Sequence, residues 1–175
     1  MPLNPLSLIL GGAASGKSAF AESLVLGSGL RPVYLATAQV LDTEMREKVT
    51  LHQERRIGAG WRVVEEPHDV SATLENVTEE ECVLLDCATF WLTNHILAQN
   101  DLQAAEASLF GAIDASKAPI VVVSNEVGAG IVPENALSRQ FREAQGKLNQ
   151  RLAERAGLVV AVMAGLPLTL KGQLP

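Results

Sequence analysis

The chain has 175 residues, of which 47% are hydrophobic and 19% are charged, and its formal net charge is −6. This length is enough for one domain with a substantial core. The acidic balance and the lack of a long basic run argue against nonspecific binding to nucleic acid. No apolar run reaches the roughly 18 residues that a membrane span needs, and the N-terminus lacks the positive region of a signal peptide. Cys82 and Cys87 form no C-x-x-C pair and are interpreted as ordinary buried thiols, so we expect a protein of the reducing cytoplasm.

Apolar runs and helical patterns alternate along the whole chain. In order, the pattern predicts a strand at 6–10, a helix at 19–26, a strand at 32–36, a helix at 42–56 closed by Gly58, and strands at 61–65 and 82–85. It continues with helices at 89–97 and 102–115, a strand at 119–123, a glycine-containing loop at 125–133, a long helix at 135–156, a strand at 158–163 and an edge strand at 166–170. We therefore expect an α/β fold with a mostly parallel sheet and helices on both faces. No repeat, low-complexity segment or long linker divides residues 1–175, which indicates a single domain.

A glycine-rich turn stands between the first strand and the first helix. Its sequence fits the phosphate-binding pattern G-x-x-x-x-G-K-[ST] of nucleoside triphosphatases. The glycines let successive backbone N–H groups face one anion, and the following helix presents its positive end to the same phosphates. The lysine supplies a charge for the β- and γ-phosphates, and the serine hydroxyl can bind Mg²⁺. A plain glycine turn is the alternative, but strand before and helix after favour nucleotide binding. The residues of the turn are Gly11, Gly12, Ala13, Ala14, Ser15, Gly16, Lys17 and Ser18.

Two other strand ends are expected near this loop, because ligands of parallel sheets sit beyond the carboxyl ends of the strands. Asp86 ends the run Cys-Val-Leu-Leu-Asp, where a carboxylate is a usual partner of Mg²⁺. The alternative role for Asp86 is a helix cap. Thr37, Ala38 and Gln39 follow another strand and are expected to meet the loop. Glu65, with Glu66, ends a further strand, where a carboxylate either binds a ribose or is solvated.

His52 is ambiguous from periodicity. It shares a helix face with Val49 and Arg56, so a histidine on a partly buried stripe is the simpler interpretation. Arg55 and Arg56 are nevertheless good phosphate partners, and a neutral imidazole beside them could attack a phosphorus centre.

Other charged or titratable side chains carry weaker signals. His68 and His95 are interpreted as structural, because the three histidines lack metal-ligand spacing. Arg139 and Arg142 on the long helix are either a solvated face or charges directed at phosphate or a neighbouring subunit.

Several stretches together resemble one family, the bifunctional adenosylcobinamide kinase / adenosylcobinamide-phosphate guanylyltransferases of cobalamin biosynthesis. The resemblance covers nearly the whole chain in order, and its most specific part is the loop Asn-Glu-Val-Gly-Ala-Gly-Ile-Val-Pro. The matching stretches are residues 11–18, 34–38, 42–45 with His52, 84–94, 124–133, Arg139, Phe141, Arg142, Asn149, Gln150, 165–168 and Lys171.

This resemblance implies a P-loop, RecA-like fold and two reactions. ATP or GTP phosphorylates the aminopropanol hydroxyl of adenosylcobinamide, and GTP then donates GMP to that phosphate through a guanylylated histidine, which matches His52. The implied nucleotide-binding residues are 11–18, Thr37, Ala38, Gln39, Gln53, Glu54, Arg55 and Arg56. The family also implies a corrinoid substrate and a homotrimer with the active site near a subunit interface.

The chain departs from the family at Ala14, where many members carry arginine; the backbone cradle does not depend on that side chain. Two alternatives stay open. A single-activity P-loop kinase of another small hydroxyl substrate would use Lys17, Ser18 and Asp86 and leave His52 structural. The second alternative is a non-catalytic nucleotide-dependent switch or binding module. The chain lacks the N-K-x-D stretch that recognises guanine in Ras-like GTPases, which argues against a switch of that kind.

Overall fold

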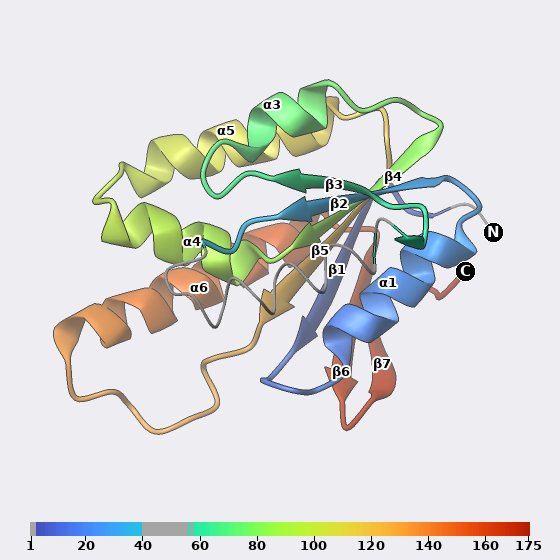
Figure 1. The fold of residues 1–175 in the computed structure, drawn as a ribbon. Helices are drawn as coiled ribbons and strands as arrows, with labels where there is room; N and C mark the ends of the chain where they lie inside the picture. Colours follow the sequence, from blue (N-terminus) through green and yellow to red (C-terminus); the bar gives the residue numbers. More distant parts are fainter. Residues whose placement is uncertain (1–2, 40–55, 57) are drawn as a thin grey trace.

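The fold, taken from a computed structural model, is described for residues 3–39, 56 and 58–175 (Figure 1). Its strands are β1 (Leu6–Gly11), β2 (Arg31–Ala36), β3 (Arg62–Glu65), β4 (Glu81–Asp86), β5 (Ile120–Asn125), β6 (Leu158–Met163) and β7 (Leu166–Lys171). Its helices are α1 (Lys17–Gly27), α3 (Val70–Glu75), α4 (Ala88–Leu97), α5 (Leu102–Ala115) and α6 (Ala136–Arg155). Most of the predicted helix at 42–56 lies outside the described residues.

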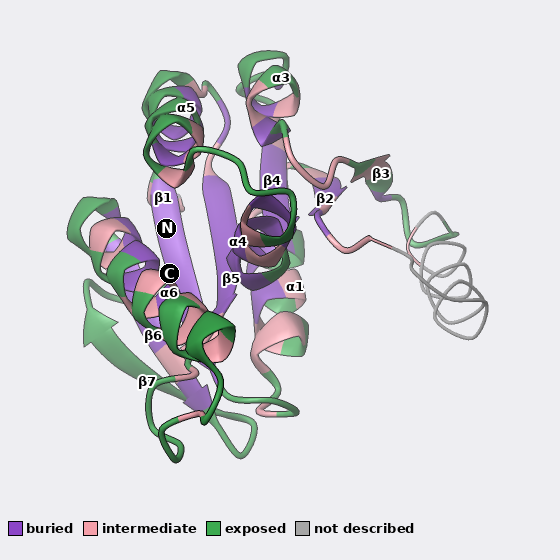
Figure 2. Ribbon diagram, turned by 90° about the vertical axis from the view of Figure 1, so that its left-hand side faces the viewer, coloured by how far each residue is buried: buried purple, intermediate pink, exposed green. Residues whose placement is uncertain are grey.

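The seven strands form one sheet in the order β3-β2-β4-β5-β1-β6-β7. All neighbouring strands are parallel except β6 and β7, which pair antiparallel at one edge. The central strands are runs of Val, Ile and Leu buried on both faces, whereas every residue of β7 is exposed (Figure 2). The predicted mostly parallel sheet and its edge strand are confirmed.

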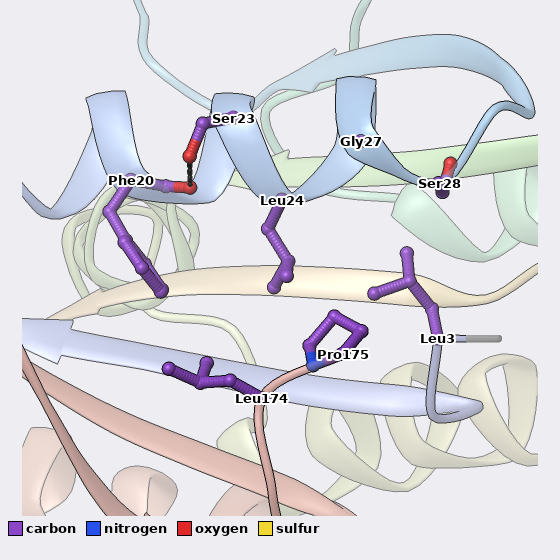
Figure 3. Close-up of a pocket in the computed structure, with 8 residues that line it drawn as sticks. All are labelled: Leu3, Phe20, Ser23, Leu24, Gly27, Ser28, Leu174 and Pro175. Carbon is purple, nitrogen blue, oxygen red and sulfur yellow. Dashed lines mark hydrogen bonds between the residues drawn. The ribbon is translucent and has the colours of Figure 1, made fainter. Parts of the chain in front are cut away.

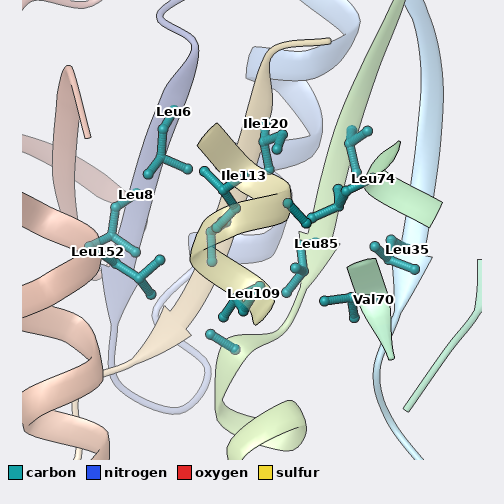
Figure 4. Packing of buried hydrophobic residues seen from close by; sticks show 14 of the residues in the cluster. Leu6, Leu8, Leu35, Val70, Leu74, Leu85, Leu109, Ile113, Ile120 and Leu152 are labelled. Atoms are coloured by element: carbon teal, nitrogen blue, oxygen red, sulfur yellow. The ribbon is translucent and has the colours of Figure 1, made fainter. Parts of the chain in front are cut away.

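Side chains that alternate along each strand divide the core between the two faces of the sheet. Leu8 points to the face covered by α3, α4, α5 and α6, where it joins residues such as Leu85, Leu109 and Leu152 (Figure 4). Its neighbour Ile9 points to the opposite face, which α1 covers. Burying one aliphatic side chain stabilises the fold by roughly 1.5–3 kcal/mol relative to leaving it exposed. Because alternate residues of the same strands enter both clusters, these strands hold the helices on both faces of the sheet.

Polar side chains fix where the helices begin and end. Asp101 accepts hydrogen bonds from the N–H groups of Gln103 and Ala104 at the start of α5, and Asn135 accepts one from Ser138 at the start of α6. At the other end of α6, the Lys171 ammonium donates to the carbonyls of residues 153 and 154. These contacts satisfy backbone groups that helix ends leave free, and they match the predicted bounds of both helices.

Two local features differ from the sequence-based expectation. The short helix α3 was not predicted, because six residues are too few to show a period; Val70 and Leu74 bury its inner face. Gly58 was expected to close the helix at 42–56, but Gly58 is itself helical. Gly60 adopts the left-handed conformation instead, with φ of 86°, and Trp61 N–H bonds back to the Arg56 carbonyl. Gly58 and Gly60 are both close enough to the helix to end it, and the sequence alone does not show which of them takes the left-handed conformation.

Among the helices of the described residues, none combines the length and the apolar character needed to cross a membrane.

Candidate active site

The phosphate-binding loop joins β1 to α1 at the carboxyl edge of the sheet (Figure 1). Ala14 and Gly16 both have positive φ, 54° and 92°. Such left-handed residues turn successive N–H groups into a concave anion-binding surface. No acidic side chain occupies the first turn of α1, so its positive end faces the loop uncompensated. The Lys17 ammonium lies across the loop and donates to the Gly12 carbonyl at 3.0 Å.

The far side of this loop rests on β6 and the β6–β7 turn. Gly165 N–H donates to the Ser15 carbonyl at 2.8 Å. A Cβ on Gly16 would lie 3.1 Å from the Gly165 Cα, and a Cβ on Gly11 would lie 2.7 Å from the Val162 carbonyl oxygen. The shape of the loop therefore depends on a hairpin about 150 residues away in the sequence, a contact that the loop pattern alone does not indicate.

Strand register brings the other predicted strand ends to the same edge. Gly11 pairs with Asn125 on β5, and Asp86 on β4 pairs with Val123 of β5 and Ala36 of β2. Because these strands are parallel, the loop and the residues that follow β2 and β4 emerge together.

Asp86 is held by its neighbours on β2. Its Oδ2 accepts a hydrogen bond of 2.7 Å from the Tyr34 hydroxyl. Burial raises the pKa of the Asp86 carboxyl, while the Tyr34 hydrogen bond and the positive charges of Arg56 and Lys17 act in the opposite direction. The cap of α4 is Cys87, whose Sγ accepts from the Phe90 N–H. The helix-cap alternative for Asp86 is therefore wrong.

The donor atoms at this edge fit a hard cation. Ser18 and Asp86 offer only a hydroxyl and a carboxylate, the ligand types that Mg²⁺ prefers. Over residues 3–39, 56 and 58–175, no cluster of three or more His, Cys, Asp or Glu could hold a metal. A Mg²⁺ ion held by one hydroxyl and one carboxylate would take its remaining oxygen ligands from water and from nucleotide phosphates, as Mg²⁺ usually does.

Arg56 is the one predicted site residue of the 53–56 stretch that the structure describes. Its Nε and Nη2 donate to Glu22 Oε1 on α1 at 3.1 and 2.8 Å. Its guanidinium carbon lies 3.7 Å from the centre of the Tyr34 ring, and Trp61 packs edge-on against the same ring. His52, Gln53, Glu54 and Arg55 lie outside the described residues, so their roles stay predictions.

Whole-chain comparison identifies the family that carries this site. A sequence model of the family "Cobinamide kinase / cobinamide phosphate guanyltransferase" matches residues 7–170. The chain belongs to this family.

Individual relatives agree with this assignment. The chain is 44% identical to the "Bifunctional adenosylcobalamin biosynthesis protein CobP" of Pseudomonas aeruginosa, over 95% of the chain and 97% of that relative. It is 37% identical to the protein named CobU, with the same description, of Escherichia coli, over 94% of the chain and 98% of that relative.

Solved structures show the fold alone. The RadB recombinase superposes with a TM-score of 0.53 at 16% identity, covering 91% of this chain and 74% of that protein. An ATPase of a bacterial type III secretion system superposes with a TM-score of 0.54 at 12% identity, covering 94% and 56%. The predicted RecA-like P-loop architecture is confirmed.

The stretch after β2, which the family resemblance assigns to nucleotide, divides into two kinds of residue. Thr37 is fully buried, and its hydroxyl donates to the Cys87 carbonyl at 2.7 Å and accepts from the Cys87 N–H at 2.8 Å. Ala38 and Gln39 are partly exposed. Thr37 thus ties β2 to β4, and the two following residues are the ones available to a ligand.

The two glutamates at the end of β3 are also distinct. Glu65 is exposed at the carboxyl edge, where its proposed contact with a ribose stays a prediction. Glu66 accepts hydrogen bonds from the N–H groups of His68 and Asp69 and shapes the turn into α3.

The most family-specific loop, residues 125–133, receives hydrogen bonds from two arginines of α6. Arg139 donates to the carbonyls of Pro133 and Glu134, and Arg142 donates to the Gly128 carbonyl. Both arginines therefore hold the loop backbone, a role that neither sequence-based interpretation included.

A buried polar cluster holds the start of the same loop. Asn149 accepts hydrogen bonds from Ser124 and Gln145 and donates to the Asn125 carbonyl, while the Asn125 N–H donates to Thr89. Gln145 Oε1 is buried and has no hydrogen-bond partner among the described residues, so this cluster is only partly satisfied. Through Asn149, α6 is bonded directly to the backbone where the loop begins.

His68 and His95 form a structural pair under α3. His95 Nε2 lies 3.2 Å from the His68 carbonyl, Asn100 Nδ2 lies 3.0 Å from His95 Nδ1, and Trp91 Nε1 donates to the His68 carbonyl. These partners fit a neutral imidazole with Nε2 protonated. Burial lowers the pKa of His95, and the hydrogen bond to His68 opposes this only partly. The structural interpretation agrees with these contacts.

The two cysteines are free and buried. Burial raises the pKa of Cys82 to about 12 and that of Cys87 to about 11. Neither is a reactive thiolate near neutral pH, so the interpretation of ordinary buried thiols is confirmed.

A cavity of about 320 Å³ lies between α1 and the C-terminus, lined by Phe20 and Leu24 on the helix and by Leu174 and Pro175 (Figure 3). None of residues 11–18 lines it. This cavity is therefore separate from the nucleotide edge.

Sequence reasoning missed two residues of the site, Glu22 and Tyr34. Tyr34 lies within a family-matching stretch, but its contacts with Arg56 and Asp86 come from other elements. Glu22 meets Arg56 across 34 residues of sequence. A strand tyrosine and a helix glutamate are common, so no local pattern marks them.

The loop packing predicts that alanine destabilises the protein at Gly11 but not at its neighbour Gly12. Gly11→Ala should lower the free energy of unfolding by about 1–3 kcal/mol, because the new methyl group meets the Val162 carbonyl and must displace backbone. Gly12→Ala is the matched control, since nothing lies within 4 Å of its Cβ. Urea denaturation of both variants measures this, and equal stabilities would contradict the packing.

The pKa of His95 predicts a pH dependence of stability. Its folded value is lowered, so the unfolded chain binds the proton more tightly, and stability falls as pH drops below about 6.5 through the folded pKa. When the free energy of unfolding is measured by denaturation between pH 8 and pH 5, it should fall less steeply for His95→Gln than for the unaltered chain. The same slope in both proteins would disprove this contribution.

Proposed function

We propose that this chain catalyses both reactions of its family at one phosphate-binding loop. In the first, the hydroxyl oxygen of adenosylcobinamide attacks the γ-phosphorus of ATP or GTP; the nucleoside diphosphate leaves and the hydroxyl proton is lost. In the second, GTP donates GMP to the new phosphate and releases pyrophosphate, giving adenosylcobinamide-GDP. The observation that carries this proposal is the formed phosphate loop in a chain that matches the family over residues 7–170.

The loop residues supply the positioning that phosphoryl transfer requires. The backbone N–H groups of residues 11–18 and the Lys17 ammonium hold the β- and γ-phosphates. Ser18 and Asp86 would hold Mg²⁺, which when bound neutralises charge on the phosphate oxygens. Ala38, Gln39 and Glu65 at the same edge would contact the nucleoside.

His52 is the proposed nucleophile of guanylyl transfer. Its ring nitrogen attacks the α-phosphorus of GTP and pyrophosphate leaves; an oxygen of adenosylcobinamide phosphate then attacks the same phosphorus and the histidine leaves. Gln53, Glu54, Arg55 and Arg56 are proposed to surround the nucleotide. The description of the relatives as bifunctional supports two reactions on one chain.

We further propose that residues 1–175 act as one catalytic domain in a cytoplasmic homotrimer. Exposed apolar side chains in and just after the family-specific loop support an assembly: Ile131 is 97% exposed, Val132 65% and Leu137 52%. Large apolar side chains left exposed close together in the sequence are often covered in a protein interface.

Lys17→Ala should lower the rates of both reactions by at least about 100-fold, because one positioned charge in an active site is worth several kcal/mol. Steady-state kinase and transferase assays measure this. Lys117→Ala, an exposed lysine at the opposite end of the sheet, is the control. Near-normal turnover of Lys17→Ala in either assay would show that this loop is not the shared nucleotide site.

Asp86→Asn should raise the Mg²⁺ concentration needed for half-maximal rate, since the amide keeps the shape but loses the charge. The Tyr34 hydroxyl can still donate to the amide oxygen, so the circular dichroism spectrum should be unchanged. A Mg²⁺ titration of the rate decides; identical titration curves would exclude Asp86 as a metal ligand.

His52→Ala should abolish protein-bound GMP and guanylyl transfer while kinase activity remains. Phosphoryl transfer needs alignment and charge stabilisation, whereas the covalent route needs a nucleophile at the α-phosphorus. Mass spectrometry after incubation with GTP measures the adduct, and His68→Gln is the control. An adduct on the His52→Ala protein, or normal synthesis of adenosylcobinamide-GDP by it, would favour the single-activity kinase.

A further inference from the structure

Four side chains from separate parts of the chain form a continuous series of contacts, which we name the Arg56 anchor: Glu22, Arg56, Tyr34 and Asp86. Glu22 on α1 accepts two hydrogen bonds from the Arg56 guanidinium, which lies over the Tyr34 ring on β2. Tyr34 in turn donates to Asp86 at the end of β4. The anchor thus joins the helix after the phosphate loop, two core strands and the residue that follows the His52 stretch.

The ion pair in this anchor differs from a surface pair. The Arg56 side chain is 17% exposed and that of Glu22 32%, whereas the pair Arg31–Glu80, with the same N–O distance of 2.8 Å, is 68% and 75% exposed. Exposed pairs contribute little because solvent screens them. The Arg56 guanidinium donates two hydrogen bonds to Glu22 and also lies over the Tyr34 ring. Together these two contacts define one position for the guanidinium.

This position constrains what Arg56 can do. Its Nε and Nη2 already bond to Glu22, so it cannot place them on a phosphate without leaving its partner. Glu22 belongs to α1 and Tyr34 to β2, whose central residues are buried in the core. Arg56 is therefore fixed to α1 and β2 at a point four residues beyond His52 in the sequence.

We propose that Glu22 and Tyr34 are positioning residues for guanylyl transfer, which act by holding Arg56 and so setting where the His52 stretch joins the rest of the fold. This inference rests on the proposed function of His52. The kinase reaction uses the phosphate loop and Asp86 but not His52. Loosening the Glu22–Arg56 contact leaves the loop and Asp86 in place, so it affects the two reactions unequally.

The first experiment compares Glu22→Gln with Glu80→Gln, its matched control at the exposed pair. The readouts are the rate of protein-bound GMP formation from GTP labelled at the α-phosphate and kcat of the kinase reaction. A misplacement of about 1 Å can lower a rate about 100-fold, so we expect GMP formation to fall about 10- to 100-fold in Glu22→Gln, with kinase kcat within about threefold. Glu80→Gln should match the unaltered chain in both assays.

A second pair of variants separates the two contacts of Tyr34. Tyr34→Phe keeps the ring under Arg56 and loses only the bond to Asp86, so at saturating Mg²⁺ the rate of GMP formation should stay within about threefold. Tyr34→Leu removes the ring and should lower that rate about tenfold or more. Equal rates in Phe and Leu variants would overturn the role of the ring.

A double-mutant cycle tests whether Glu22 acts through Arg56. Glu22→Gln combined with Arg56→Met should form protein-bound GMP no more slowly than Arg56→Met alone, because coupled residues are not additive. The inference would be overturned if the two substitutions lowered the rate of GMP formation by factors that multiply in the double variant. It would also be overturned if Glu22→Gln lowered the kinase and guanylyl-transfer rates equally. If the unaltered chain forms no adduct, the proposed guanylyl transfer itself fails; if it forms one and Glu22→Gln forms it equally fast, only the anchor is wrong.

Discussion

The turn from β1 into α1 is the constraint on which the rest of the site depends. Converging backbone N–H groups require left-handed residues at Ala14 and Gly16, and the close contact with β6 requires that Gly11 have no side chain. The β6–β7 turn supports the loop from behind through Gly165. The edge strand, which has no buried residue of its own, therefore contributes to the shape of the nucleotide site.

The order of the strands then decides which side chains meet that loop. Because β5 lies between β1 and β4, Asp86 emerges one strand away from the loop, close enough for the Lys17 charge to act on its pKa. Burial disfavours the charge on Asp86 in the protein alone, and a bound cation would offset this penalty. A carboxylate kept at a cost to the folded chain is expected where function requires it.

The sequence predicted the regular elements well and the long-range contacts poorly. Continuous apolar runs such as residues 119–123 identified the buried strands, and apolar spacing identified the long helices such as the one predicted at 135–156. The helix α3 was missed because six residues show no period. Glu22 and Tyr34 were missed because their roles depend on Arg56, which reaches them only in three dimensions. Arg139 and Arg142 were correctly placed on α6, but their contacts with loop carbonyls follow from how α6 packs against β5.

The central claim is that one phosphate loop serves both the kinase and the guanylyltransferase reactions. Isothermal titration calorimetry with ATP and GTP analogues whose phosphates cannot be cleaved tests it most directly. The account predicts one nucleotide bound per chain, and complete loss of the GTP-analogue signal when the ATP analogue is already bound. Two independent sites per chain, with both analogues bound at once, would contradict it.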